Sequence, residues 1–188
     1  MPGGMMFWAN LLGYQIVWFV VIGGAARGLW WPGVVAAALF AAAHLRFGVR
    51  DPASRATDAR LLIVAIAIGL VLDGMLARSG LVRYAASDIA LPSGGAPLWI
   101  LALWACFALT LRHSMAALIR LPQVAALAGA VFGPLAYYGV ARVGAAATLS
   151  TPQWQPLLAL CIGWISAMLI FATLARHWSP PRNVIETP

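Results

Sequence analysis

The sequence predicts an all-α membrane protein, a bundle of six transmembrane helices with both termini in the cytoplasm. Of its 188 residues, 63% are hydrophobic and only 9% are charged. So few charges cannot cover a soluble domain of this size. Each of six apolar runs approaches the roughly 20 residues that a helix needs to cross a bilayer. The runs cover residues 7–24, 29–47, 61–77, 97–115, 122–141 and 154–175.

The positions of the positive charges give the predicted orientation. All twelve basic residues are arginines, and most lie at the ends of apolar runs, which favours membrane orientation over nucleic-acid binding. With the N-terminus inside, the inner connections hold Arg46, Arg50, Arg55, Arg60, Arg112, Arg120, Arg176 and Arg182. The outer connections hold Arg27, Arg78, Arg83 and Arg142. This excess on one side predicts that both termini are cytoplasmic.

The first three runs are predicted to be helices because backbone hydrogen bonds cannot be left open in lipid. We expect the first run to remain in the mature protein as a helix. A cleaved signal peptide begins with a basic region, and Met1 to Met6 include no basic side chain. A polar inner connection, Gly48 to Arg60, separates the second run from the third. The third run contains a carboxylate, Asp73.

The last three runs follow an outer connection, Arg78 to Pro97, whose Gly and Pro residues predict a short cap or a re-entrant turn. In the fifth run, Gly129 and Gly133 repeat every four residues and predict a packing seam. This seam also offers a surface for a protein partner or a second copy. Residues 1–178 are expected to form a single domain, and residues 179–188 a disordered cytoplasmic tail.

Asp73 is the most informative polar residue. A carboxylate near the middle of a membrane helix costs on the order of 2.5 to 3.5 kcal/mol, so it normally faces a partner or water. It is either a ligand-binding or proton-coupling group or half of a structural ion pair. Candidate partners at the same predicted depth are Arg27, Arg78, Arg142, Tyr137 and Tyr138. We favour Arg27 or Arg142, and Gln15 is placed near mid-depth.

A second polar layer is predicted near the inner face, where Asn10, His44, Arg112 and His113 lie at similar depth. Two histidines on different helices are the minimum for a haem or metal site. Because no carboxylate accompanies them, we expect no metal and no cofactor, and interpret them as interfacial hydrogen-bonding groups. Arg112 could grip a phosphate, but an ordinary positive helix end is the simpler interpretation. No catalytic motif is recognisable.

Four segments, taken together, resemble a known family. They are FWANLLGYQIVWFVVIGGAARG, GLVLDGMLARSG, PLWILALWACFALTLRHSM and GAVFGPLAYYGVARVGA. Together they resemble domain-of-unknown-function family 2878, small polytopic proteins of the bacterial inner membrane. The resemblance implies a multi-pass inner-membrane protein and no particular reaction. The matching positions, none with an assigned role, are Asn10, Gln15, Asp73, Gly74, Pro97, Trp99, Trp104, His113, Ser114, Gly133, Pro134 and Tyr137.

The leading functional hypothesis is a membrane-embedded component that binds or transports a small molecule or lipid. Its pocket is expected near Asp73 and Tyr137, walled by the first, third and fifth helices. One alternative is an enzyme or accessory subunit of lipid modification, acting through the inner polar layer. Another is a structural partner in a membrane complex. Membrane lipid is the expected partner in each case, and nucleic acid is not.

Overall fold

A computed structural model describes residues 3–49 and 51–178 of the chain, and almost all of its regular structure is helical. The helices are α1 (Gly3–Ala25), α2 (Trp31–Ala43), α3 (Pro52–Arg78), α4 (Leu98–Leu111), α5 (Ala116–Ile119), α6 (Pro122–Gly139) and α7 (Trp154–Trp178). Two π-helical turns, η1 (His44–Gly48) and η2 (Val140–Gly144), continue α2 and α6. Arg50 and the predicted tail at 179–188 lie outside the described residues.

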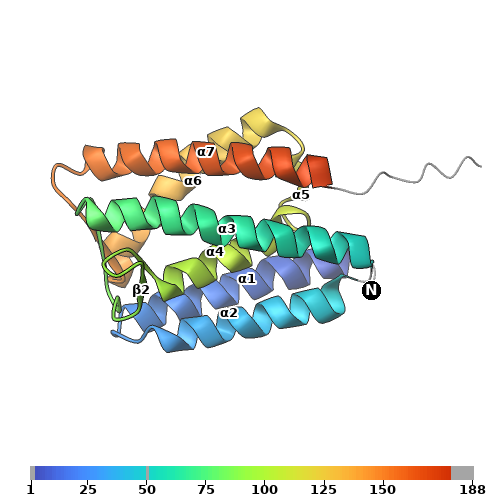
Figure 1. Cartoon of the computed structure of the whole chain (residues 1–188), viewed down its shortest axis with the longest axis horizontal. Coiled ribbons are helices and arrows are strands. Elements are labelled where there is room, and N and C mark those ends of the chain that lie inside the picture. Colours follow the sequence, from blue (N-terminus) through green and yellow to red (C-terminus); the bar gives the residue numbers. More distant parts are fainter. Residues whose placement is uncertain (1–2, 50, 179–188) are drawn as a thin grey trace, which may run out of the picture.

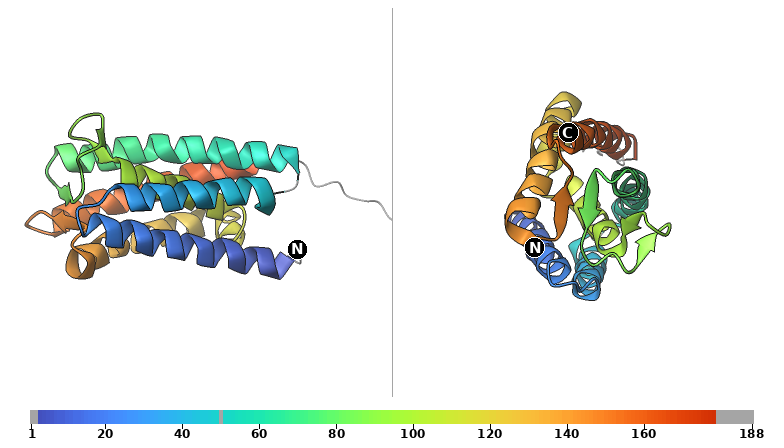
Figure 2. Two further views of the ribbon diagram at one scale, coloured as in Figure 1. Left: turned by 90° about the horizontal axis from the view of Figure 1, so that it is seen from below. Right: turned by 90° about the vertical axis from the view of Figure 1, so that its left-hand side faces the viewer.

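Six of the helices lie side by side in alternating directions, with the short α5 at one end (Figure 1). The beginning of α1 and the end of α7 lie at that same end, which we call the α5 end. The opposite, strand end carries two small antiparallel pairs (Figure 2). These pair β1 (Val82–Tyr84) with β4 (Ala147–Leu149), and β2 (Ala90–Leu91) with β3 (Ala96–Pro97).

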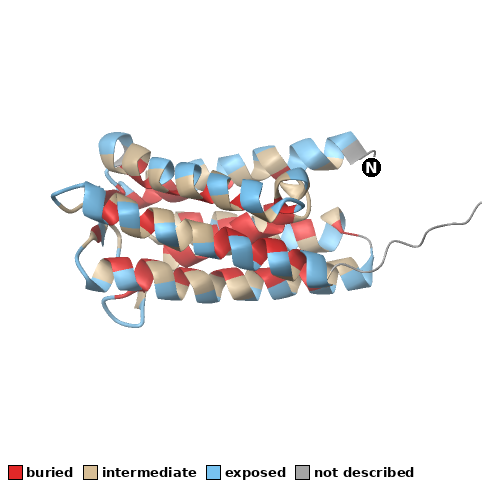
Figure 3. Cartoon of the chain, turned by 90° about the horizontal axis from the view of Figure 1, so that it is seen from above, coloured by how far each residue is buried: buried red, intermediate tan, exposed pale blue. Residues whose placement is uncertain are grey.

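The outer surface of the bundle is apolar. Phe19, Leu39, Ile63 and Phe132 are each more than 60% exposed, and exposed positions run along the outside of the bundle (Figure 3). Four helical segments are long and apolar enough to cross a membrane: 4–25, 52–78, 122–143 and 154–178. A shorter apolar helix, α4, has 14 residues. The chain is therefore a helical membrane protein with four candidate spans.

The start of α3 differs from the sequence prediction, because the helix begins at Pro52 instead of at residue 61. Asp51 caps it, accepting a hydrogen bond from the Ser54 N–H at 2.8 Å, and this bond lowers the pKa of Asp51. Pro52 occupies the first turn, where its missing N–H is harmless. The predicted polar connection is thus largely helical, and it places Asp58 on the buried face of α3.

Glycines let two tryptophan rings enter the centre of the bundle. A Cβ at Gly133 of α6 would collide with the Trp164 ring of α7, and one at Gly69 of α3 would collide with the Trp104 ring of α4. The two indoles stack with centroids 4.7 Å apart. The predicted seam in α6 therefore packs against α7 of the same chain. Gly129 and Gly133 are both buried there, so this arrangement does not offer them to a partner.

The helices form two groups. In the first, α1 packs mainly against α2 and α4, and α3 packs against α4. In the second, α6 packs mainly against α7. The groups are joined at the strand end by the β1–β4 pair, at the α5 end by α5, and between the ends by packing of α3 on α7 and of Trp104 on Trp164. A cavity described below lies where the two groups face each other.

Candidate functional site

Asp73 lies at the centre of a hydrogen-bonded cluster near the strand end. Its side chain is fully buried and accepts three hydrogen bonds. The Tyr84 hydroxyl donates to Oδ1 at 2.6 Å, and the Trp104 Nε1–H donates to Oδ2 at 2.6 Å. The Tyr137 hydroxyl also donates to Oδ1. Three helices and a strand thus converge on one carboxyl group, and the Tyr137 bond links the two helix groups.

The partners of Asp73 differ from those favoured by the sequence. Within residues 3–49 and 51–178 it forms no ion pair. Arg27 instead donates to the Gly23 carbonyl oxygen at 2.7 Å, and Arg142 lies over the Tyr138 ring. Both arginines are exposed, whereas Asp73 is inaccessible to their heads. An arginine partner would have to lose its own hydration to reach the buried carboxyl group. Neutral donors that are already buried can hydrogen-bond to it without that cost.

Tyr84, which lies outside the helices, was not singled out by the sequence analysis. Burial, reinforced by the negative charge of Asp73, raises the pKa of Tyr84 well above its ordinary value. The hydroxyl therefore stays protonated and remains a donor. Its ring meets Trp99 edge-on at 5.9 Å between centroids, and the Trp99 indole donates to the Ala85 carbonyl oxygen. These contacts fix the β1 segment over the first turn of α4.

A cavity of about 590 Å³ lies between the two helix groups. Its wall comes mainly from α1, α4, α6 and α7, with Tyr84 and Ala147 at the strand end and Met115 and Leu118 at the α5 end. The third helix was expected in this wall, but no α3 residue lines the cavity. Asp73 instead reaches the wall indirectly, through Tyr84, Trp104 and Tyr137.

The cavity wall is largely aromatic and apolar. Its aromatic residues are Tyr14, Trp18, Tyr84, Trp99, Trp104, Phe107, Phe132, Tyr137 and Trp164. Gln15 adds an amide to the lining. The Trp164 Nε1–H is buried with no hydrogen-bond partner in the described part of the chain. Phe132 and Leu135 line the cavity although they are 67% and 56% exposed, so the cavity reaches the lipid-facing surface of α6.

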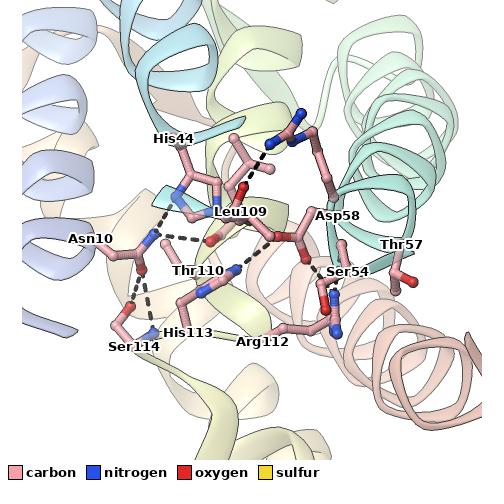
Figure 4. A network of polar contacts seen from close by, with 12 residues as sticks. Asn10, His44, Ser54, Thr57, Asp58, Leu109, Thr110, Arg112, His113 and Ser114 are labelled. Atoms are coloured by element: carbon pink, nitrogen blue, oxygen red, sulfur yellow. Dashed lines mark hydrogen bonds and ion pairs between the residues drawn. The ribbon is translucent and has the colours of Figure 1, made fainter. Parts of the chain in front are cut away.

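A second polar cluster lies at the α5 end, centred on Asp58 (Figure 4). Asp58 is fully buried. Its Oδ1 accepts a hydrogen bond from Arg112 at 2.8 Å. Its Oδ2 lies 2.8 Å from Nε2 of His113 and 3.5 Å from Nε2 of His44. The carboxylate thus ties α3 to η1 and to the turn that follows α4.

Asn10 extends this cluster to α1. Its amide nitrogen donates to the Leu109 carbonyl oxygen at 3.0 Å and lies 3.3 Å from Nδ1 of His44. Its amide oxygen accepts from both the backbone N–H and the hydroxyl of Ser114. The structure therefore brings together the four predicted inner-layer residues, Asn10, His44, Arg112 and His113, around a carboxylate that the prediction lacked (Figure 4).

The carboxyl groups at the centres of the two clusters, Asp58 and Asp73, lie fifteen residues apart on α3. Both lie within the part of the chain that matches a known family. A family model described as "Protein of unknown function (DUF2878)" matches residues 7–170. The chain belongs to this family. The match extends the resemblance noted in the sequence into α7. No curated protein and no solved structure matches the chain.

In this DUF2878 member, Asp58 was not predicted as a site residue. It lies in residues 50–60, whose many charged side chains are typical of a polar loop. A usable signal was present: Asp51 followed by Pro52 is the pattern of a helix N-terminus. Extending the helix from there places Asp58 seven residues from the cap, within the first two turns. Tyr84 carried no comparable signal, because its position depends on how the connection after α3 folds back.

Proposed function

We propose that the chain is a membrane-embedded component that binds and transports an apolar or amphipathic small molecule in the cavity between α1, α4, α6 and α7. The supporting observation is the cavity of about 590 Å³, a size typical of small-molecule sites. Such sites combine apolar walls with a few polar groups. Gln15 and the unpartnered Trp164 N–H supply those groups here.

The wall chemistry limits the ligand class. Among the described residues, no arginine, histidine or acidic side chain lines the cavity, so a highly charged solute would lose its hydration without compensation. A flat or flexible apolar body gains contact with the stacked Trp104 and Trp164 rings. The exposed rim at Phe132 and Leu135 gives such a ligand direct access from the bilayer.

Filling the cavity from α6 is expected to abolish binding. Gly139 lines the cavity, and a Cβ built on it meets nothing within 4 Å. Gly139→Phe should therefore occupy ligand space without displacing backbone. We expect affinity for an environment-sensitive apolar dye, followed by quenching of tryptophan fluorescence, to fall at least about tenfold, or 1.4 kcal/mol.

The matched control is Val131→Phe, which adds a similar ring on the exposed face of the same helix, where Val131 is 50% exposed. This variant should bind the dye as the wild type does. Equal affinities for all three proteins would show that the dye dissolves in the lipid or detergent around the bundle, and the proposed function would be lost.

The proposal includes six crossings of a bacterial inner membrane by residues 1–178, with both termini in the cytoplasm. The distribution of arginines supports this orientation, and the α5 end is then the cytoplasmic one. Single cysteines at Asp51 and at Asp88, in a variant lacking Cys106 and Cys161, should react on opposite sides of sealed membranes. Labelling of both positions from one side would contradict the six-crossing topology.

A further inference from the structure

We propose that His44, Asp58 and His113 bind a divalent transition-metal ion of the zinc or iron(II) class. They come from three segments: η1, α3 and the turn after α4. One ligand atom from each lies within 4.8 Å of the others. Two histidines and one carboxylate form the donor set of catalytic zinc sites and of non-haem iron(II) sites that keep open coordination positions.

The distances suit an ion placed between the three groups. Bonds of about 2.0–2.2 Å set neighbouring ligand atoms roughly 3–3.5 Å apart. Asp58 Oδ2 lies 2.8 Å and 3.5 Å from the two Nε2 atoms, so small side-chain rotations suffice. The Nε2 of His44 also points to a ligand: it is buried, has no hydrogen-bond partner among the described residues, and faces Asp58.

Arg112 fixes the orientation of the carboxylate. It holds Oδ1 at 2.8 Å and also donates to the Ser54 carbonyl oxygen, which leaves Oδ2 directed at the histidines. Hydrogen bonds to the outer atom of a ligating carboxylate are a regular feature of metal sites. Because Arg112 already neutralises Asp58, a divalent ion brings excess positive charge. Its open positions therefore favour an anion such as hydroxide.

The three side chains are most accessible on the side of His113. The His113 side chain is 21% exposed, against 4% for His44 and 1% for Asp58. An ion and its exchangeable ligand would therefore enter past His113, at the α5 end of the bundle. His113 is accordingly the ligand whose removal disturbs the buried core least.

Asn10 sets the proton position on His44. Its amide nitrogen faces Nδ1, so in the arrangement described here the ring proton belongs on Nε2. Metal binding through Nε2 moves that proton to Nδ1, which then needs an acceptor. The Asn10 amide must turn its oxygen toward His44, which gives up its bond to Leu109 and the two bonds that it accepts from Ser114. Asn10 is therefore a positioning residue for the metal ligand.

Titration of the full-length chain with Co²⁺ and with Zn²⁺ tests the site, using a purification tag without histidine. We expect one ion per chain with a dissociation constant of about 1 µM or tighter. Bound Co²⁺ should show the intensified visible absorption of a nitrogen-containing, low-symmetry site. His113→Ala should weaken binding at least about 100-fold.

His177→Ala is the matched control, because His177 is the third histidine of the chain and lies exposed at the end of α7. It should bind as the wild type does. Weak millimolar binding, a Co²⁺ spectrum equal to that of the aqueous ion, or equal losses in both variants would overturn the metal site. The wild-type spectrum decides the matter even if His113→Ala fails to fold. Gly139→Phe should leave metal affinity unchanged, so this test is independent of the cavity.

Discussion

Replacing Asp73 with alanine is expected to lower the free energy of unfolding by about 3 kcal/mol. The variant leaves three buried donors without acceptors: the hydroxyls of Tyr84 and Tyr137 and the indole N–H of Trp104. At the lower limit of roughly 1 kcal/mol for each unpaired donor, the sum is about 3 kcal/mol. For a chain of this length that loss corresponds to a fall in melting temperature of about 6–12 °C.

Thermal unfolding in detergent micelles measures this change. Asp73→Asn should lose much less, since the amide oxygen still accepts from Trp104 and the tyrosine oxygens can accept from the amide nitrogen. Asp88→Ala is the control, because Asp88 is an exposed acid in the connection between α3 and α4. If Asp73→Ala has the same melting temperature as the wild type, the three hydrogen bonds do not stabilise the fold.

Asp58→Ala is the second variant with a large expected effect. Removing one partner of a buried ion pair costs about 3–5 kcal/mol because an uncompensated charge stays buried. The Arg112 side chain is 15% exposed and keeps its bond to the Ser54 carbonyl oxygen, so the lower value, about 3 kcal/mol, is expected here. The melting temperature is again the measurement.

A double replacement tests whether the unpaired charge is the cause. Asp58→Leu combined with Arg112→Met removes both charges and should recover most of the lost stability, as apolar replacements of buried ion pairs do. Asp51→Asn serves as the control on the same helix, since asparagine caps a helix as well as aspartate does. Failure of the double variant to melt above Asp58→Ala would mean that the histidine contacts, and not Arg112, account for the effect.

Composition and spacing predicted the depth of most polar residues in the helices. Asn10, His44, Arg112 and His113 could be placed at one depth because each lies a countable number of residues from the end of an apolar run. The same counting placed Asp73 near Tyr137, which donates to it. It failed for Tyr84, because depth is undefined for a residue in a connection whose path follows from strand pairing.

The amino-acid sequence by itself determined that the chain is a helical membrane protein, where most of its helices lie, and which polar residues lie inside them. Lipid accepts only segments that satisfy their own backbone hydrogen bonds, so local composition carries that information. The tertiary structure alone decided which side chains meet. It assigned neutral donors to Asp73 in place of arginines, inserted Asp58 between two histidines, and used the Gly133 seam within the chain. Such pairings depend on helix rotation and close packing, which sequence periodicity does not encode.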